Sequence, residues 1–393
     1  MTRNPSAAER KWSTRKMLQV RLRTTLMAIS LAATMSIGTV ATPPAGAAPT
    51  DDATGPSYLL VGGTGSSNIG VLRESSGRLT PVGQPVPTDT GTLSIAVTPN
   101  GRFAYVAHTV SGNLQGFRVG DDGTLERLEG ARLAPGRPIV GAVVSPDGKW
   151  LFATVGSVTN DVQTYAIAPS GVLTQVDSVT IPGATSGLSI PVVSPDGRFL
   201  FAPSFIGATM DSYAIGFDGR LTRTGSQVPT GDRPALPSVT PNGKFLYITN
   251  EGTNDVSGYR IAPDGVLAPI GRFPTKAIPH GMAITPDGRY LYLPQTGGQA
   301  VNGFEIRDDG ALVPVPGADA PSAPGHFPGR VVLSPDAQRL YVIDTLTTTG
   351  TEKVFTYRVK PDGALEATGE PPVDTGVTFS DGATGVFASV GPA

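Results

Sequence analysis

The stretch SVTPNGKFLYITNEGTNDVSGYRIAPDGVLAPIG (Ser238–Gly271) holds two turn signals, Pro-Asn-Gly and Pro-Asp-Gly, separated by runs rich in β-branched and aromatic residues. Glycine supplies the positive φ that tight turns between antiparallel strands require. The same frame returns in five further stretches, which begin at Val97, Val144, Val193, Ile284 and Leu333. A unit that recurs at roughly 47 residues marks a repeat architecture, in which each copy is a small sheet packed against its neighbours.

The glycines of the second turn count the copies. They are Gly77, Gly123, Gly171, Gly219, Gly265, Gly310 and Gly363, which makes seven. The first turn occurs only six times, at Gly101, Gly148, Gly197, Gly243, Gly288 and Ala337. The earliest copy lacks its first strand, because it begins at YLLVGG (Tyr58–Gly63), which aligns with FAYVAH (Phe103–His108).

A strand that fits this gap lies at the other end of the chain. DGATGVFASVGPA (Asp381–Ala393) has the register of IPHGMAITPDG (Ile278–Gly288), and no second strand comes after it. Closing a ring with the two ends of the chain removes the open sheet edges that promote aggregation. We therefore predict an all-β fold for residues 56–393: a seven-bladed β-propeller of four-stranded blades, with the C-terminal strand completing the first blade.

The composition supports a packed β fold. Hydrophobic residues make up 39% of the chain and charged residues 16%, which argues against disorder despite 50 glycines and 37 prolines. These glycines and prolines interrupt any long helical period. Cysteine is absent, which excludes a disulfide framework, a thiolate metal site and a cysteine nucleophile.

Residues 1–47 are expected to be a secretory signal peptide. Basic residues precede an apolar run (Leu26–Ala41), and the segment ending at Ala47 fits a small-x-small cleavage site. Cleavage there would leave a short linker, residues 48–55, before the propeller. Two translation starts, Met1 and Met17, stay open. The apolar run is too short for a membrane span, and the mature chain's net charge of about −8 disfavours nucleic acid as a partner.

The units VSPDGK and LYITN resemble those of the YVTN-repeat and lactonase-like seven-bladed propellers, a group that includes bacterial 6-phosphogluconolactonase and carboxymuconate cyclase. The resemblance covers residues 56–393, and its most specific element is NGKFLYITNEGTNDVSGYRI (Asn242–Ile261). It implies lactone chemistry and places Glu251 where the family has an acidic residue in its central cleft. The family's Arg-His pair just upstream is not reproduced, since DRPALPSVTPNG (Asp232–Gly243) supplies Arg233 but no histidine.

Four residues are the catalytic candidates. Hydrolysis of a lactone needs a base that deprotonates water and a cation or N–H group that stabilises the oxyanion. Glu251 is the expected base, and His280, Arg233 or Arg330 the expected stabiliser. The structural alternatives are that Glu251 is a solvated loop charge and that His280 braces neighbouring blades.

Further polar side chains are expected around the same mouth, where loops between the second and third strands of each blade should gather. The predicted ligand-binding residues are His108, Asn250, Asp255, Gln295, His326 and Asp344. No metal site and no cofactor are predicted, since neither a metal-ligand spacing nor a dinucleotide motif occurs.

Two functions from different classes stay open. The first is an exported lactonase-like hydrolase with a small-molecule site at the central funnel, acting on a lactone or related cyclic ester of a sugar acid. The second is a non-catalytic extracellular propeller that binds a glycan, a small molecule or a protein partner. In both cases we expect a secreted monomer. Phosphorylated sugar lactones are intracellular metabolites, so an extracellular address disfavours them as substrates.

Overall fold

The computed structural model describes residues 56–156, 160–181, 190–347, 350–380 and 385–390. The chain divides into two compact units, and the second, Ser36–Ala393, contains all of these residues. The predicted signal peptide (1–47) and linker (48–55) lie outside the described residues. No helix within the described ranges is long and apolar enough to span a membrane.

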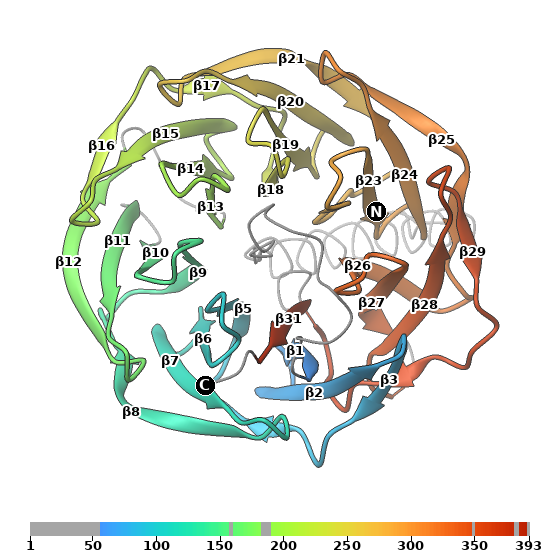
Figure 1. Ribbon diagram of the computed structural model, residues 1–393, viewed down its shortest axis with the longest axis horizontal. Coiled ribbons are helices and arrows are strands. Elements are labelled where there is room, and N and C mark those ends of the chain that lie inside the picture. The colour runs from blue at the N-terminus through green and yellow to red at the C-terminus, as the bar shows by residue number, and fades with distance from the viewer. Residues whose placement is uncertain (1–55, 157–159, 182–189, 348–349, 381–384, 391–393) are drawn as a thin grey trace, which may run out of the picture. The chain divides into compact units, whose positions relative to one another are not determined.

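Seven antiparallel sheets form the blades of a propeller (Figure 1). Blade 1 consists of β31 (Gly385–Ser389), β1 (Ser57–Gly63), β2 (Asn68–Ser75), β3 (Arg78–Pro81) and β4 (Val86–Pro87). Blade 2 consists of β5 (Thr92–Val97), β6 (Phe103–His108), β7 (Asn113–Val119) and β8 (Leu125–Leu133). Blade 3 consists of β9 (Ile139–Val144), β10 (Trp150–Gly156), β11 (Asn160–Ile167) and β12 (Leu173–Thr180). Blade 4 consists of β13 (Val192–Val193), β14 (Phe199–Ser204), β15 (Thr209–Ile215), β16 (Leu221–Arg223) and β17 (Val228–Pro229).

Three more blades complete the ring. Blade 5 consists of β18 (Pro234–Val239), β19 (Phe245–Asn250), β20 (Asp255–Ile261) and β21 (Leu267–Pro274). Blade 6 consists of β22 (Ala283–Ile284), β23 (Tyr290–Gln295), β24 (Ala300–Ile306) and β25 (Leu312–Pro321). Blade 7 consists of β26 (His326–Leu333), β27 (Arg339–Thr347), β28 (Lys353–Val359), β29 (Leu365–Ala367) and β30 (Val373–Asp374). In blades 1, 4 and 7 the outermost strand is interrupted, and both pieces pair with the same third strand. The prediction of seven four-stranded blades is confirmed.

The predicted ring closure is also confirmed. Strand β31 pairs antiparallel with β1, with Ser57 opposite Ser389 and Val61 opposite Gly385. The two strands lie side by side in Figure 1, one red and one blue, although they come from opposite ends of the described chain. The hydroxyls of Ser57 and Ser389 lie 3.0 Å apart and add a side-chain hydrogen bond to the seam. The first blade is therefore built from both ends of the propeller sequence.

Neighbouring blades are joined by aromatic side chains that lie against the second-turn glycine of the next blade. A Cβ on Gly265 of blade 5, for example, would stand 2.3 Å from the ring of Phe199 in blade 4. Only glycine leaves room for that ring. A tyrosine two residues after the packing aromatic residue adds a hydrogen bond to the same seam. In blade 5 the packing residue is Phe245, and Tyr247 Oη donates to the Gly310 carbonyl in blade 6 at 2.8 Å. The same bond joins Tyr105 to Gly171 and Tyr292 to Gly363.

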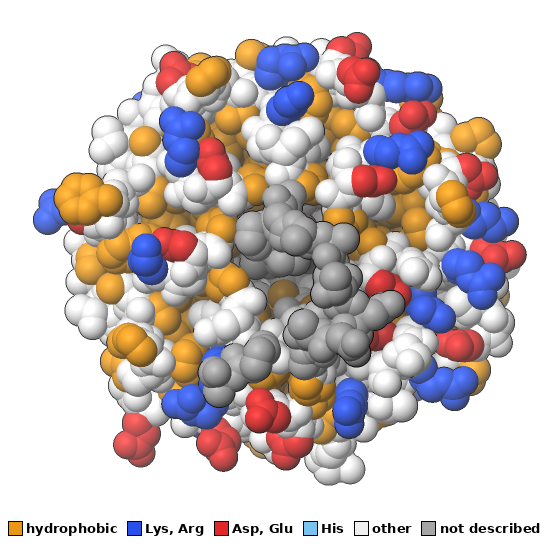
Figure 2. All heavy atoms as spheres, viewed as in Figure 1, with side chains coloured by type: hydrophobic (Ala, Val, Ile, Leu, Met, Phe, Trp, Pro, Cys, Tyr) orange, Lys and Arg blue, Asp and Glu red, His pale blue; other side chains and the backbone are white. Residues whose placement is uncertain are grey.

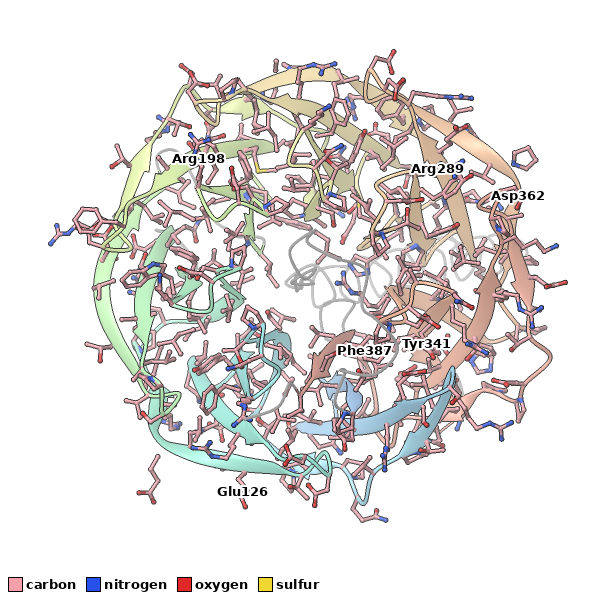
Figure 3. The ribbon with its side chains drawn as sticks, viewed as in Figure 1. Glu126, Arg198, Arg289, Tyr341, Asp362 and Phe387 are labelled. Carbon is pink, nitrogen blue, oxygen red and sulfur yellow. The ribbon has the colours of Figure 1, made fainter. Side chains whose placement is uncertain are left out.

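The seam between blade 7 and blade 1 departs from this pattern. Arg339 takes the place of the aromatic ring against Gly77, and the buried hydroxyl of Tyr341 makes no hydrogen bond within the described residues. The cause is a shorter second turn in blade 1, where Ser75 pairs directly with Arg78. The corresponding turns elsewhere are wider, as where Ala262 donates its amide to the Val266 carbonyl. Tyr341 packs instead on Phe387 of β31, with ring centroids 5.8 Å apart (Figure 3).

Candidate functional site

The candidate site lies where the first strands of blades 5, 6 and 7 begin. Glu251 directly follows β19 in blade 5, His280 precedes β22 in blade 6, and Arg330 lies within β26 in blade 7. In a propeller blade, the end of the second strand and the start of the first strand lie at the same edge, so three consecutive blades present these residues to one face.

Glu251 and His280 form a buried contact between blades 5 and 6. Glu251 Oε1 lies 2.8 Å from His280 Nε2, and the two side chains are 8% and 7% exposed. The backbone fixes both residues. The amide of Glu251 donates to the carbonyl of Arg233 at 3.1 Å, and the amide of His280 donates to the carbonyl of Pro294 at 3.0 Å. The structure therefore brings together two of the four catalytic candidates.

Arg330 is a buried cation next to this pair. Its side chain reaches Gly281, whose added Cβ would stand 2.3 Å from Arg330 Nη1. The residue is 3% exposed, its Nε makes no hydrogen bond, and no ion pair within the described ranges includes it. Burial lowers the pKa of the guanidinium to about 10, so it remains charged at neutral pH.

Arg233 contributes to the site through its backbone. It is half-buried and has a positive φ of 54°, and its carbonyl holds the amide of Glu251. Leu236, three residues on, also has a positive φ of 44°, within a bulge between Ala235 and Ser238. Such conformations are unfavourable for residues with a Cβ, and they concentrate at functional sites.

A second polar cluster lies in blade 7, where His326 Nδ1 lies 2.6 Å from Asp344 Oδ2. Burial raises the pKa of Asp344 to about 6, partly offset by the hydrogen bond from His326. Glu352 is 2% exposed, and burial, reinforced by the Asp344 charge, raises its pKa to about 7. Its Oε1 accepts the amide of Phe379 at 3.0 Å. Glu352 was not among the predicted site residues, because it stands in a loop between β27 and β28 that lies outside the repeated unit.

Three other predicted ligand-binding residues, His108, Asn250 and Gln295, end the second strand of their blades. The side chains of His108 and Asn250 contact nearby residues of the protein. Asn250 Nδ2 donates to Asp255 Oδ1 at 2.6 Å, and Asn250 Oδ1 accepts the amide of Gly231 at 3.0 Å. His108 Nε2 lies 2.7 Å from Thr88 Oγ1. Burial lowers the pKa of His108 to about 4, so its imidazole is neutral at pH 7.

Gln295 occupies the same strand position in blade 6 as Asn250 in blade 5 and is fully buried. Neither of its amide atoms has a hydrogen-bond partner within the described residues. The residue opposite it in the neighbouring strand is Ala300, which has no polar side chain, whereas Asn250 faces Asp255.

Neither a patch of surface charge nor a group of metal ligands marks a further site in the described residues. Lys and Arg are interspersed with Asp and Glu around the rim of the face shown in Figure 2, without a continuous patch of one sign. No group of three or more His, Asp or Glu is arranged to hold a metal ion in the part of the chain that the structure describes.

Comparison with known proteins agrees with this architecture. The family model described as lactonase, 7-bladed beta-propeller matches residues 230–325, a segment that contains Arg233, Glu251 and His280. The 6-phosphogluconolactonase of Serratia proteamaculans (strain 568) is 25% identical over 168 residues, which is 43% of this chain and 49% of that protein. The match thus spans about half the length of this relative.

Solved structures share the fold at low sequence identity. The periplasmic gluconolactonase PpgL of Pseudomonas aeruginosa superposes with a TM-score of 0.70 at 20% identity, covering 85% of this chain and 99% of that one. A protein from Lactobacillus plantarum gives a TM-score of 0.69 at 17% identity, with coverage of 85% and 99%. Together, the repeat, the ring and these matches show a seven-bladed β-propeller that is similar to the lactonase propellers.

Proposed function

We propose that the protein hydrolyses a lactone of a sugar acid at the Glu251–His280 pair. The observation that carries this proposal is the buried 2.8 Å contact between the two side chains, which joins blades 5 and 6. The pair lies within the segment that matches the lactonase family model. A carboxylate held at a fixed position can act as the general base for the attack of water, provided that the water lies within hydrogen-bond reach.

In the proposed reaction, Glu251 takes a proton from a water molecule as the water oxygen attacks the lactone carbonyl. The His280 imidazole, whose Nε2 lies 2.8 Å from Glu251 Oε1, limits the positions that the carboxylate can take. The carbonyl oxygen becomes an oxyanion, which the Arg330 guanidinium stabilises. Collapse of this intermediate breaks the bond to the ring oxygen, which takes the proton from Glu251, and the product is a hydroxy acid.

We further propose that the substrate is an unphosphorylated sugar lactone outside the cytoplasm. The predicted signal peptide supports export, and the structurally similar P. aeruginosa gluconolactonase is periplasmic. The expectation of a secreted monomer belongs to the same proposal, and size-exclusion chromatography of the mature chain would test the oligomeric state.

A hydrolysis assay with purified residues 48–393 and a panel of aldono- and aliphatic lactones tests the proposal. Glu251→Gln should lower kcat by roughly 10²- to 10⁴-fold, the usual contribution of a general base. Glu126→Gln, an exposed change on blade 2, is the matched control and should leave kcat unchanged. Full activity in Glu251→Gln would remove Glu251 from the chemistry, and inactivity of the wild type on every lactone would overturn the proposal.

The alternative function, ligand binding without catalysis, is supported by two observations. The family's Arg-His pair is absent from the sequence. Arg233 contacts Glu251 through its backbone, since its carbonyl accepts the amide hydrogen of Glu251. Under this alternative the same panel gives saturable binding and no hydrolysis.

A further inference from the structure

Arg330 belongs to a layer of buried residues that lie in the innermost strands of the blades or just before them. The members stand at the same distance before the first-turn proline of their blades: Ser94, Gly141, Ile190, Leu236, Gly281 and Arg330. Neighbours in this layer touch, since a Cβ on Gly141 would stand 2.1 Å from Ile190. Among these six residues, Arg330 alone carries a charge. An apolar side chain such as that of Ile190 would fill the position without introducing one.

Gly281 makes the conformation of Arg330 attainable. A Cβ at Gly281 would stand 2.3 Å from Arg330 Nη1 and 2.4 Å from Leu236 Cδ1. The guanidinium therefore passes over the bare backbone of blade 6 toward the bulge of blade 5 that holds Leu236 at positive φ. Leu236, Gly281 and Arg330 come from three consecutive blades, and together they determine where the guanidinium lies.

A buried charge without a counterion is strongly unfavourable, because the charge loses its hydration shell and gains no comparable interaction in the protein interior. The carboxylate of Glu251 does not provide the counterion, since it is held by His280 and forms no ion pair with Arg330. An anionic ligand would compensate the charge. The guanidinium fork matches the two oxygens of a carboxylate, and the nearby Glu251 charge favours a monoanion over a dianionic phosphate.

We propose that Arg330, positioned across Gly281, is a receptor for the carboxylate of a small polyhydroxy acid. The inference rests on the proposed function for the identity of that acid, which is the ring-opened product of a sugar lactone. The binding itself requires no hydrolysis. The protein is then a binder of aldonate anions, and its product competes with its substrate.

Isothermal titration and thermal-shift measurements on residues 48–393 test this proposal with three probes: gluconate, its neutral analogue gluconamide, and inorganic phosphate. Gluconate should bind at least ten-fold more tightly than gluconamide and raise the melting temperature. Phosphate should be the weaker anion. Equal affinity for gluconate and gluconamide would overturn the proposal, and so would tighter binding of phosphate.

Two variants separate ligand binding from structure. Arg330→Met removes the charge, and Gly281→Ala keeps the charge but displaces it; each should weaken gluconate binding at least ten-fold. Arg198→Gln, which removes an exposed arginine on blade 4, is the control and should bind normally. Without ligand, Arg330→Met should melt at least as high as the wild type, because an uncompensated buried charge is gone. A marked loss of stability in ligand-free Arg330→Met would show a structural role instead.

The two proposals fail separately. A protein that binds gluconate but hydrolyses no lactone retains this inference and loses the catalytic one. A lactonase whose activity is not inhibited by gluconate retains the catalytic proposal and loses this one.

Discussion

Replacing Tyr247 by phenylalanine removes one hydroxyl that crosses from blade 5 to blade 6. The Tyr247 side chain is fully buried, and its Oη donates to the Gly310 carbonyl at 2.8 Å. Phenylalanine keeps the ring and creates no cavity, so the change isolates the hydrogen bond. Leaving a buried carbonyl without its donor costs about 1–3 kcal/mol. We expect Tyr247→Phe to lower the free energy of unfolding by that amount.

The matched control is Tyr341→Phe at the seam between blades 7 and 1. Tyr341 is equally buried, but its hydroxyl has no partner within the described residues, because the shorter turn of blade 1 withdraws the acceptor. Removing an unpaired buried hydroxyl should be neutral or stabilise the fold by up to about 1 kcal/mol.

Urea denaturation of both variants, followed by tyrosine fluorescence and far-UV circular dichroism, measures the difference. Tyr247→Phe should move the midpoint to lower urea with an unchanged slope, whereas Tyr341→Phe should leave the midpoint in place or raise it. An equal loss of stability in both variants would refute the view that the closing seam lacks this hydrogen bond.

Three further predictions concern closure, strain and pH. Deleting Gly385–Ala393 removes β31, and the truncated chain should lose the single cooperative thermal transition; melting like the parent would disprove closure by this strand. Ala337 has a positive φ of 55° where the other first turns carry glycine, so Ala337→Gly should raise stability by about 0.5–1 kcal/mol in thermal melts, and a fall would contradict the strain argument. The raised pKa of Glu352, about 7, means that the folded state binds a proton more tightly than the unfolded chain. Stability should therefore fall as pH rises from about 4.5 to 7, and Glu352→Gln should flatten this profile while Glu126→Gln leaves it intact. His108, whose pKa is lowered, contributes the opposite slope, so the comparison of the two profiles decides: the same slope in Glu352→Gln and in the wild type would contradict the prediction.

The fold could be predicted from the sequence because each blade is encoded by a copy of the same repeated unit. Turn glycines such as Gly243 and Gly265 return at nearly constant spacing, and both have positive φ in the structure, at 70° and 84°. Closure followed from the copy that lacked a first strand. The segment predicted to supply it, 381–393, contains β31 at Gly385–Ser389.

The site was less accessible to sequence reasoning. The placement of Glu251 beside His280 follows from their equivalent edges in adjacent blades, which the repeat register indicates. Contacts inside a blade do not follow from register. Asn250 turns into its own hairpin because Asp255 faces it, and the partner of Asp344 is a histidine from its own blade. Glu352 lies in a loop that the other copies do not share, so no pattern pointed to it.

The pairing of β1 with β31 has a consequence for the order of folding. Six blades are assembled from contiguous stretches of chain and can form as those stretches are synthesised, but blade 1 holds an unpaired inner edge until residue 389 is available. The equilibrium cost of joining ends so far apart is small, since each doubling of loop length adds only about 0.6 kcal/mol. The delay is kinetic. Until β31 arrives the chain is an open array with a free strand edge, so aggregation competes with folding at this last step.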